Sequence, residues 1–157
     1  MAKVGAYELS EASGEGTARV LRAVGPDGDA VLTFPCAGDD ERDRVGFERE
    51  LRVLSAIEHP HLCRVLDHGV DEVRGPWFAT PLVLGMTLRD LFDGKSLCPE
   101  AAITILHPMI AALAALHEGG LVHRGVSPEH LVLSPVGDVT LIGLELALGS
   151  DGRSNEE

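Results

Sequence analysis

The sequence is poor in lysine, aromatic residues and cysteine. Of its 13 basic residues only Lys3 and Lys95 are lysines, and aromatic residues make up 4% of its 157 positions. The three cysteines, Cys36, Cys63 and Cys98, are widely spaced and include no C-x-x-C pair. This pattern argues against a disulfide framework or a cysteine-based zinc site, so small buried thiols in a reducing cytosol are the simpler interpretation.

Signals for export or membrane insertion are also lacking. The first residues, Met1 to Glu8, contain no apolar core of a secretory signal. No apolar run is expected to reach the ~20 residues of a membrane span. The formal charge of −12, from 13 basic and 25 acidic side chains, disfavours nucleic acid or an anionic membrane as a partner. We therefore expect a cytoplasmic protein that binds neither.

What the sequence does contain is the composition of a folded domain. Hydrophobic residues make up 45% and charged residues 24% of the chain, and a chain of this length buries roughly 70% of its unfolded surface. Apolar positions at steps of three and four residues predict a helix over Glu41–Ile57, ended by Pro60. Strands are predicted at Tyr7–Ser13, Ala18–Val24, Ala30–Phe34, Leu62–Leu66 and Trp77–Leu84.

The second half of the chain is predicted to be mainly helical. A short helix over Leu88–Phe92 precedes a long one over Pro99–His117, in which Pro108 removes a hydrogen bond and should cause a kink. A hairpin of Leu131–Leu133 with Val139–Ile142 follows. The polar tail, residues 150–157, is predicted to be disordered.

The order of motifs from about Tyr7 to Ala147 resembles that of a protein kinase domain. His123, Arg124 and Gly125, followed by His130, resemble the catalytic-loop pattern H-R-D-x-x-x-x-N. The other matching landmarks are Gly14-x-Gly16 for the glycine-rich loop, Ala30–Thr33 for the V-A-I-K strand, Glu50 for the glutamate that pairs with its lysine, His59–Leu62 for the segment after that helix, Thr80–Leu82 for the gatekeeper and hinge, and Gly143–Glu145 for D-F-G.

The resemblance implies an α+β, kinase-like fold. We expect a five-stranded, β-rich N-lobe with one helix over residues 1–84. The first part of a helical C-lobe, with two helices and the catalytic-loop hairpin, would follow over residues 85–149, before the tail at 150–157.

Four departures from the kinase pattern remove the groups that carry its chemistry. Phosphoryl transfer needs a cation on the phosphates, ligands for magnesium and a residue that orients the nucleophile. Thr33 stands where the cation is expected, Gly143 and His130 where the magnesium ligands are expected, and Gly125 where the orienting residue is expected. The pattern residues Glu50, His123 and Arg124 are retained. The resemblance therefore implies a catalytically inactive pseudokinase without a catalytic residue, cofactor or metal site. Binding of ATP and magnesium is not expected, and Val31 would also crowd an adenine ring.

One other interpretation of these residues stays open, and a second is disfavoured. Arg19 could face phosphates while acidic residues near Glu145, or Glu129, bind a metal; this would make the protein an atypical nucleotide-dependent transferase or a nucleotide-binding regulator. A histidine metal site is disfavoured because His117, His123 and His130 match no standard zinc spacing. The resemblance instead places His123 in a hydrophobic spine with Leu54, Val65 and Leu144.

The long helix predicts an interaction surface. From Ala101 to Leu116 it is apolar nearly all round, which is typical of a helix buried on several faces. The helices that cover it in a kinase are not in this sequence, so we expect a protein partner or a second copy of the chain to dock there. The alternative is that the chain was cut from a longer polypeptide that covers this face. The candidate interface residues are Leu106, Met109, Ile110, Leu113 and Leu116.

Overall fold

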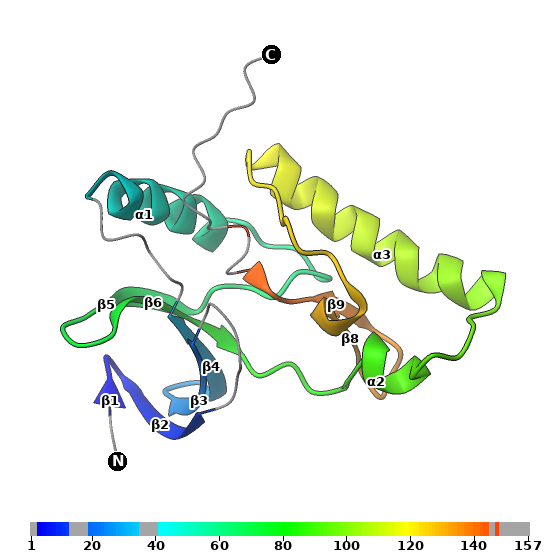
Figure 1. Cartoon of the computed structure of the whole chain (residues 1–157), viewed down its shortest axis with the longest axis horizontal. Coiled ribbons are helices and arrows are strands. Elements are labelled where there is room, and N and C mark those ends of the chain that lie inside the picture. The colour runs from blue at the N-terminus through cyan, green and yellow to red at the C-terminus, as the bar shows by residue number, and fades with distance from the viewer. Residues whose placement is uncertain (1–2, 13–18, 35–40, 145–146, 148–157) are drawn as a thin grey trace.

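The fold was analysed in a computed structural model that describes residues 3–12, 19–34, 41–144 and 147 (Figure 1). The predicted disordered tail lies outside these residues. A six-stranded antiparallel sheet with the order β1-β2-β3-β4-β6-β5 forms the N-terminal part of the molecule. Its strands are β1 (Lys3–Val4), β2 (Tyr7–Ala12), β3 (Arg19–Gly25), β4 (Gly28–Phe34), β5 (Asp67–Asp71) and β6 (Gly75–Pro81).

Two features of this sheet correct the sequence prediction. The sheet has six strands rather than five, because Lys3 and Val4 form a two-residue strand that pairs with β2. The strand predicted at Leu62–Leu66 is wrong, since the edge strand β5 begins at Asp67. Leu62 forms only a single bridge to Leu141, so the apolar run reflects burial rather than a ladder of strand pairs.

The helix that follows the first strands, α1 (Glu41–Ser55), agrees with the predicted one apart from its last two residues. The second unit contains a small sheet of β7 (Met86–Thr87), β8 (Leu131–Leu133) and β9 (Val139–Leu141), together with α2 (Leu88–Phe92) and α3 (Pro99–Glu118). Thr87 caps α2, because its Oγ1 accepts a hydrogen bond from the backbone N–H of Asp90 at 3.1 Å. The predicted helices and hairpin are thus present.

The two units share a core beneath α1 and α3. Leu51 and Leu54 of α1 belong to one buried cluster with Phe78 of β6, Leu116 of α3 and Leu141 of β9. The segment before β5 is tied to the hairpin, since the Cys63 N–H donates to the Leu141 carbonyl at 2.9 Å and the Leu141 N–H donates to the His61 carbonyl at 2.8 Å. This connection fixes β9 against the first unit and positions the residues that follow it.

The long helix α3 packs along β9 and is continuous through Pro108 (Figure 1). It buries Ile105, Ala112 and Leu116, whereas Ile103 and Ile110 are exposed. At 20 residues, with a mean hydropathy of 1.5 over its most apolar window, α3 is long and apolar enough to cross a membrane by length and composition. The expectation that no apolar run reaches this length is therefore wrong. Core helices of soluble proteins pass the same test, so α3 is weak evidence for a membrane.

Candidate functional site

The candidate site is built around the loop that connects α3 to β8. His123 lies at its start and is 1% exposed. Its Nε2 lies 2.8 Å from the Ile142 carbonyl, and its Nδ1 accepts a hydrogen bond from the Gly125 N–H at 3.3 Å. Because one nitrogen accepts, the other must donate, which assigns the Nε2–H tautomer. The sequence interpretation of His123 as a packed core residue is confirmed, and Leu54 and Leu144 are buried as expected.

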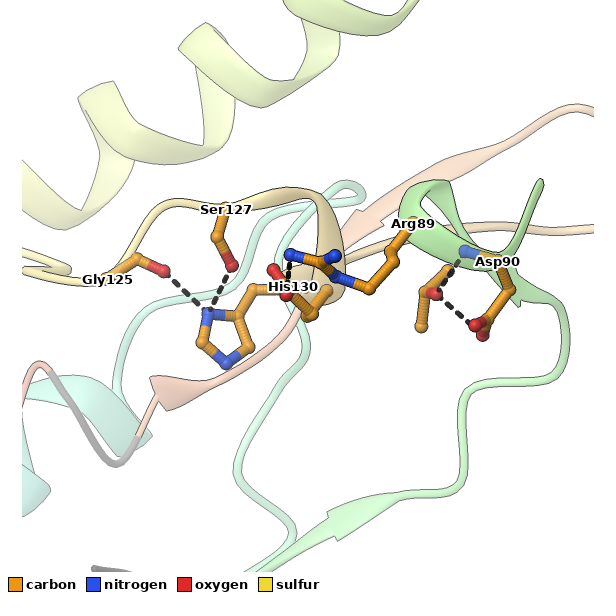
Figure 2. A network of polar contacts seen from close by, with 7 residues as sticks. Arg89, Asp90, Gly125, Ser127 and His130 are labelled. Atoms are coloured by element: carbon orange, nitrogen blue, oxygen red, sulfur yellow. Dashed lines mark hydrogen bonds and ion pairs between the residues drawn. The ribbon is translucent and has the colours of Figure 1, made fainter. Parts of the chain in front are cut away.

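The second histidine of the loop, His130, bonds to the carbonyl of the same residue, Gly125. His130 Nδ1 lies 2.6 Å from the carbonyl oxygen of Gly125 and 3.3 Å from Ser127 Oγ, as Figure 2 shows. A carbonyl only accepts, so His130 carries its proton on Nδ1. The Gly125 N–H therefore donates to one imidazole and the Gly125 carbonyl accepts from the other, and the two ring centroids are 5.9 Å apart.

Gly143 completes this cluster from the end of β9. Its φ of +81° lies in the left-handed region that favours glycine. A Cβ built on Gly143 would lie 2.7 Å from Cδ2 of His130, closer than side chains approach. The imidazole thus occupies the space into which a side chain at position 143 would project. Of the four predicted degenerate positions, His130 thus contacts two others, Gly125 and Gly143.

The fourth degenerate position, Thr33, comes from the six-stranded sheet and lines one cavity together with His130 and Gly143. It is 4% exposed in β4, where it is paired with Phe78 of β6. The glutamate that would pair with a lysine at this position, Glu50, lies on α1. One of its carboxylate oxygens, Oε2, is buried without a hydrogen-bond partner among the described residues. Burial raises the pKa of Glu50, and the positive charge of Arg124 opposes that rise. The sequence could not tell whether Glu50 faces solvent or an arginine. In the structure Glu50 is half-buried, and the positive charge that acts on it is that of Arg124.

Arg124 itself has an unusual backbone. It is one of two residues other than glycine with a positive φ in the described part of the chain, at +63°. Left-handed residues of this kind are uncommon and mark places where the surrounding structure dictates the backbone path. Here the turn at Arg124 lies between buried His123 and Gly125, whose N–H bonds His123 and whose carbonyl bonds His130.

A cavity of about 190 Å³ lies between the six-stranded sheet and the β8–β9 hairpin. Val20 and Val31 line it from the sheet, and Val132, Ile142 and Leu144 line it from the other side. The described residues that contribute polar side chains are Thr33, Cys63, Thr80 and His130, and none of those that line the cavity is acidic, Lys or Arg. The cavity is therefore apolar with a few neutral polar groups.

The residues of the alternative interpretation are not assembled into a site. Arg19 begins β3, but its side chain lies outside what the structure describes, and Glu145 lies outside the described residues altogether. Glu129 forms an ion pair with Arg89 of α2 (Figure 2). Hydrogen bonds from the Ser127 side chain, from its own backbone N–H and from Arg89 lower the pKa of Glu129, so this carboxylate already has partners.

The predicted interface on α3 is only partly exposed. Leu106 and Ile110 are 45% and 59% exposed, but Leu116 is fully buried, so its assignment to the interface is wrong. Met109 and Leu113 are half-buried against the core. Ile103, at 67% exposed, was missed although it lies three residues before Leu106 on the same stripe. The helix is apolar on nearly all sides, and its sequence therefore did not distinguish the covered face from the open one.

Sequence reasoning also missed Ser127 and the carbonyl of Gly125 as contacts of His130. A serine three residues before a histidine, next to a proline that opens the short 3-10 turn η1 (Pro128–His130), was the available signal. Nothing in the sequence marks a backbone carbonyl as a ring contact, because its position depends on the left-handed turn at Arg124.

Comparison with known proteins finds kinases. No protein-family model matches the chain. The serine/threonine-protein kinase PknL of Mycobacterium tuberculosis is 38% identical over 112 residues, covering 71% of this chain and 28% of PknL. The probable serine/threonine-protein kinase SCO3848 of Streptomyces coelicolor is 31% identical and PkaB of the same organism is 34% identical, covering 96% and 95% of this chain. The chain spans 24% of SCO3848 and 37% of PkaB.

The fold comparison agrees. The crystal structure of Rad53 residues 1–466 in complex with AMP-PNP matches 90% of this chain and 38% of its own, with a TM-score of 0.75 and 22% identity. At that identity the likeness shows the fold alone, and it confirms the expected mixed α+β, kinase-like architecture.

Proposed function

We propose that this chain, which belongs to the protein kinase-like superfamily, is a catalytically inactive domain that acts as a protein-interaction or regulatory module. The observation that carries the proposal is the cluster of His130, Gly125 and Gly143. In the kinase pattern these three positions hold the magnesium-binding and nucleophile-orienting groups. Here they hold an imidazole ring packed over a glycine and bonded to a backbone carbonyl.

The chemistry of these groups supports inactivity. Magnesium binds oxygen ligands in near-octahedral geometry, and phosphoryl transfer needs positive charge on the phosphates. His130 uses Nδ1 for the Gly125 carbonyl, Gly143 has no side chain, and Thr33 brings no charge to the cavity. The relatives are named as kinases, whereas this chain departs from the general kinase pattern at four positions.

A phosphotransfer assay tests inactivity. We expect the purified chain with radiolabelled ATP and either magnesium or manganese to transfer no phosphate to itself or to a generic basic protein substrate. The matched comparison is a fourfold variant that restores the kinase pattern, T33K/G125D/H130N/G143D. Phosphate transfer by the unmodified chain would contradict the proposal if it is lost when one of these four residues is replaced. That result would favour the nucleotide-dependent alternative.

The interaction role is supported by the exposed stripe of Ile103, Leu106 and Ile110 on α3. From Ala101 to Leu116 this helix carries no Asp, Glu, Lys or Arg, as is typical of the centre of an interface. We expect sedimentation velocity at micromolar concentration to detect self-association, or affinity capture to recover a protein partner. Either interaction should be lost in Leu106→Asp. The control is Val136→Asp, a change at an 84% exposed position in the β8–β9 turn. Equal behaviour of the two variants would remove α3 from the proposal.

A further inference from the structure

The open side of α3 carries a pattern that its apolar residues alone do not describe. Six exposed residues, which we call the seam, follow one another at alternating steps of three and four residues: Glu100, Ile103, His107, Ile110, Ala114 and His117. This alternation is the seven-residue repeat of a coiled coil, in which one line of side chains faces a second helix. Because α3 packs on β9 with its other side, the seam lies at the edge of the molecule (Figure 1).

The seam is complementary to itself when two copies of it run antiparallel. Rotation about its midpoint places Glu100 of one copy opposite His117 of the other, and Ile103 opposite Ala114. A carboxylate then meets an imidazole, which can donate an N–H, and a large side chain meets a small one. The middle pair combines a histidine with an isoleucine, so no position meets its own kind. A parallel pair would instead oppose the two Glu100 carboxylates. Self-complementarity of this sort is what an interface with two-fold symmetry requires.

Charge and polarity favour a second copy over a lipid surface. Between Glu100 and Glu118 the helix carries no Asp, Glu, Lys or Arg, so the net charge of −12 is kept away from the middle of the contact. Half of the seam residues are polar and recur along its whole length, whereas a helix that inserts into a membrane surface presents an apolar face to it. The pairing of unlike residues about one midpoint fits a copy of the same helix.

We propose that two copies of the chain associate through α3 as an antiparallel helix pair, with Glu100 of each copy bonded to His117 of the other copy. This inference rests on the proposed interaction role of α3 and names its partner. The helix pair is short, because α3 has 20 residues, and half of the seam is polar. The dimer is therefore weak, with a Kd on the order of 10 μM.

Disulfide formation between copies tests the antiparallel register. The 157-residue chain is used in a C36S/C98S background, which leaves buried Cys63 as its one native thiol. In the antiparallel pair Ile103 lies opposite Ala114, whereas the two Ile103 residues lie about 16 Å apart along the axis. We therefore expect a mixture of the I103C and A114C variants to form a disulfide dimer, located by mass spectrometry, and each variant alone to form little. A disulfide between two I103C chains, with none in the mixture, overturns the proposal.

The contact at the two ends of the seam is tested by sedimentation velocity. His117→Lys places an ammonium opposite each Glu100 carboxylate, so the Kd should fall about threefold to tenfold through two symmetric ion pairs. The gain should disappear in the double variant E100Q/H117K. The matched control is Asp138→Asn, which changes the net charge by the same amount at an exposed position in the β8–β9 turn. Equal tightening by the control overturns the Glu100–His117 contact, because net charge alone would then account for it.

The outcomes also separate this inference from the proposed function. Capture of a different protein that Leu106→Asp abolishes, with no disulfide between copies, overturns the helix pair and leaves the interaction role of α3 in place. Cosedimentation with neutral phosphatidylcholine vesicles, again with no disulfide, assigns the seam to lipid and overturns the pair as well. A disulfide in the I103C and A114C mixture together with tightening by His117→Lys supports both.

Discussion

His123 and His130 lie in one loop and both bond to the backbone of Gly125, yet their surroundings differ. His123 is buried, accepts from the Gly125 N–H and donates to the Ile142 carbonyl. His130 donates to the Gly125 carbonyl, packs over Gly143 and borders a cavity. The first half of the loop keeps a residue of the kinase pattern because that residue is part of the core. The second half has changed where the pattern holds its chemistry. The comparison separates a residue that the core requires from one at a position where the kinase pattern carries its chemistry.

The largest effect should come from removing the buried histidine. His123→Ala leaves a cavity and two backbone groups without partners, so we expect a loss of roughly 3 kcal/mol in the free energy of unfolding. Urea denaturation measures it. The control His117→Ala changes an exposed residue of α3 and should stay within about 0.5 kcal/mol. Equal losses in the two variants would show that the contacts of His123 do not stabilise the fold.

The contact between the second histidine and Gly143 can be tested by a double-mutant cycle. Gly143→Asp meets the His130 ring and imposes a side chain on a φ of +81°, so we expect about 2–3 kcal/mol of destabilisation. His130→Ala in the same chain should recover part of this loss, because the steric conflict disappears while the backbone strain remains. Strict additivity of the two changes would show that His130 does not fill the space over Gly143.

A smaller effect on stability is expected from Glu50. Its carboxylate interacts electrostatically with Arg124, which lies in the first half of the loop. Burial raises its folded pKa above the ordinary value of 4.5, so its contribution to stability is most favourable at low pH and declines as pH rises through the folded pKa. We therefore expect Glu50→Gln to raise the melting temperature at pH 7, with the gain shrinking toward pH 4.5. Arg52→Gln, on the same helix, serves as a control. A gain that grows as the pH is lowered would contradict the sign.

The smallest effect concerns Ser127 and Glu129, in the second half of the loop. The hydrogen bond from Ser127 is the main cause of the lowered pKa of Glu129. Ser127→Ala should move the carboxyl pKa of Glu129 upward toward its ordinary value, as measured by carbon-detected NMR titration. Ser96→Ala, at an exposed position, should leave the titration unchanged. An unchanged pKa of Glu129 in the Ser127→Ala variant would show that Arg89 and the backbone alone lower this pKa.

Much of the fold could be predicted from local patterns. The short helix α2 was predicted with its bounds, and the structure adds the cap that Thr87 forms with Asp90. The edge strand β5 was not, since its sequence is polar and its pairing depends on β6 rather than on its own residues. Local apolar content favoured Leu62–Leu66 instead. A strand defined by its neighbour leaves little signal in its own sequence.

The site could be predicted residue by residue but not as an arrangement. The sequence identified Gly125, His130 and Gly143 as departures from a kinase pattern one at a time. Their contact depends on a positive φ at Arg124 and on a glycine 13 positions after His130, neither of which a linear pattern expresses. The sequence also did not predict which side of α3 is exposed and which is buried. The buried side is determined by contacts with β9 and the core and not by the spacing of apolar residues in the helix.

The packing of His130 over Gly143 has a consequence for how such a domain can change over generations. An aspartate acquired first at position 143 would meet the imidazole, so the mutation would reduce folding before it could improve function. An asparagine acquired first at position 130 would remove the ring and its bond to Gly125 without gaining a metal ligand opposite. Each single change therefore loses a contact before the other can follow, so the residues at positions 130 and 143 constrain one another.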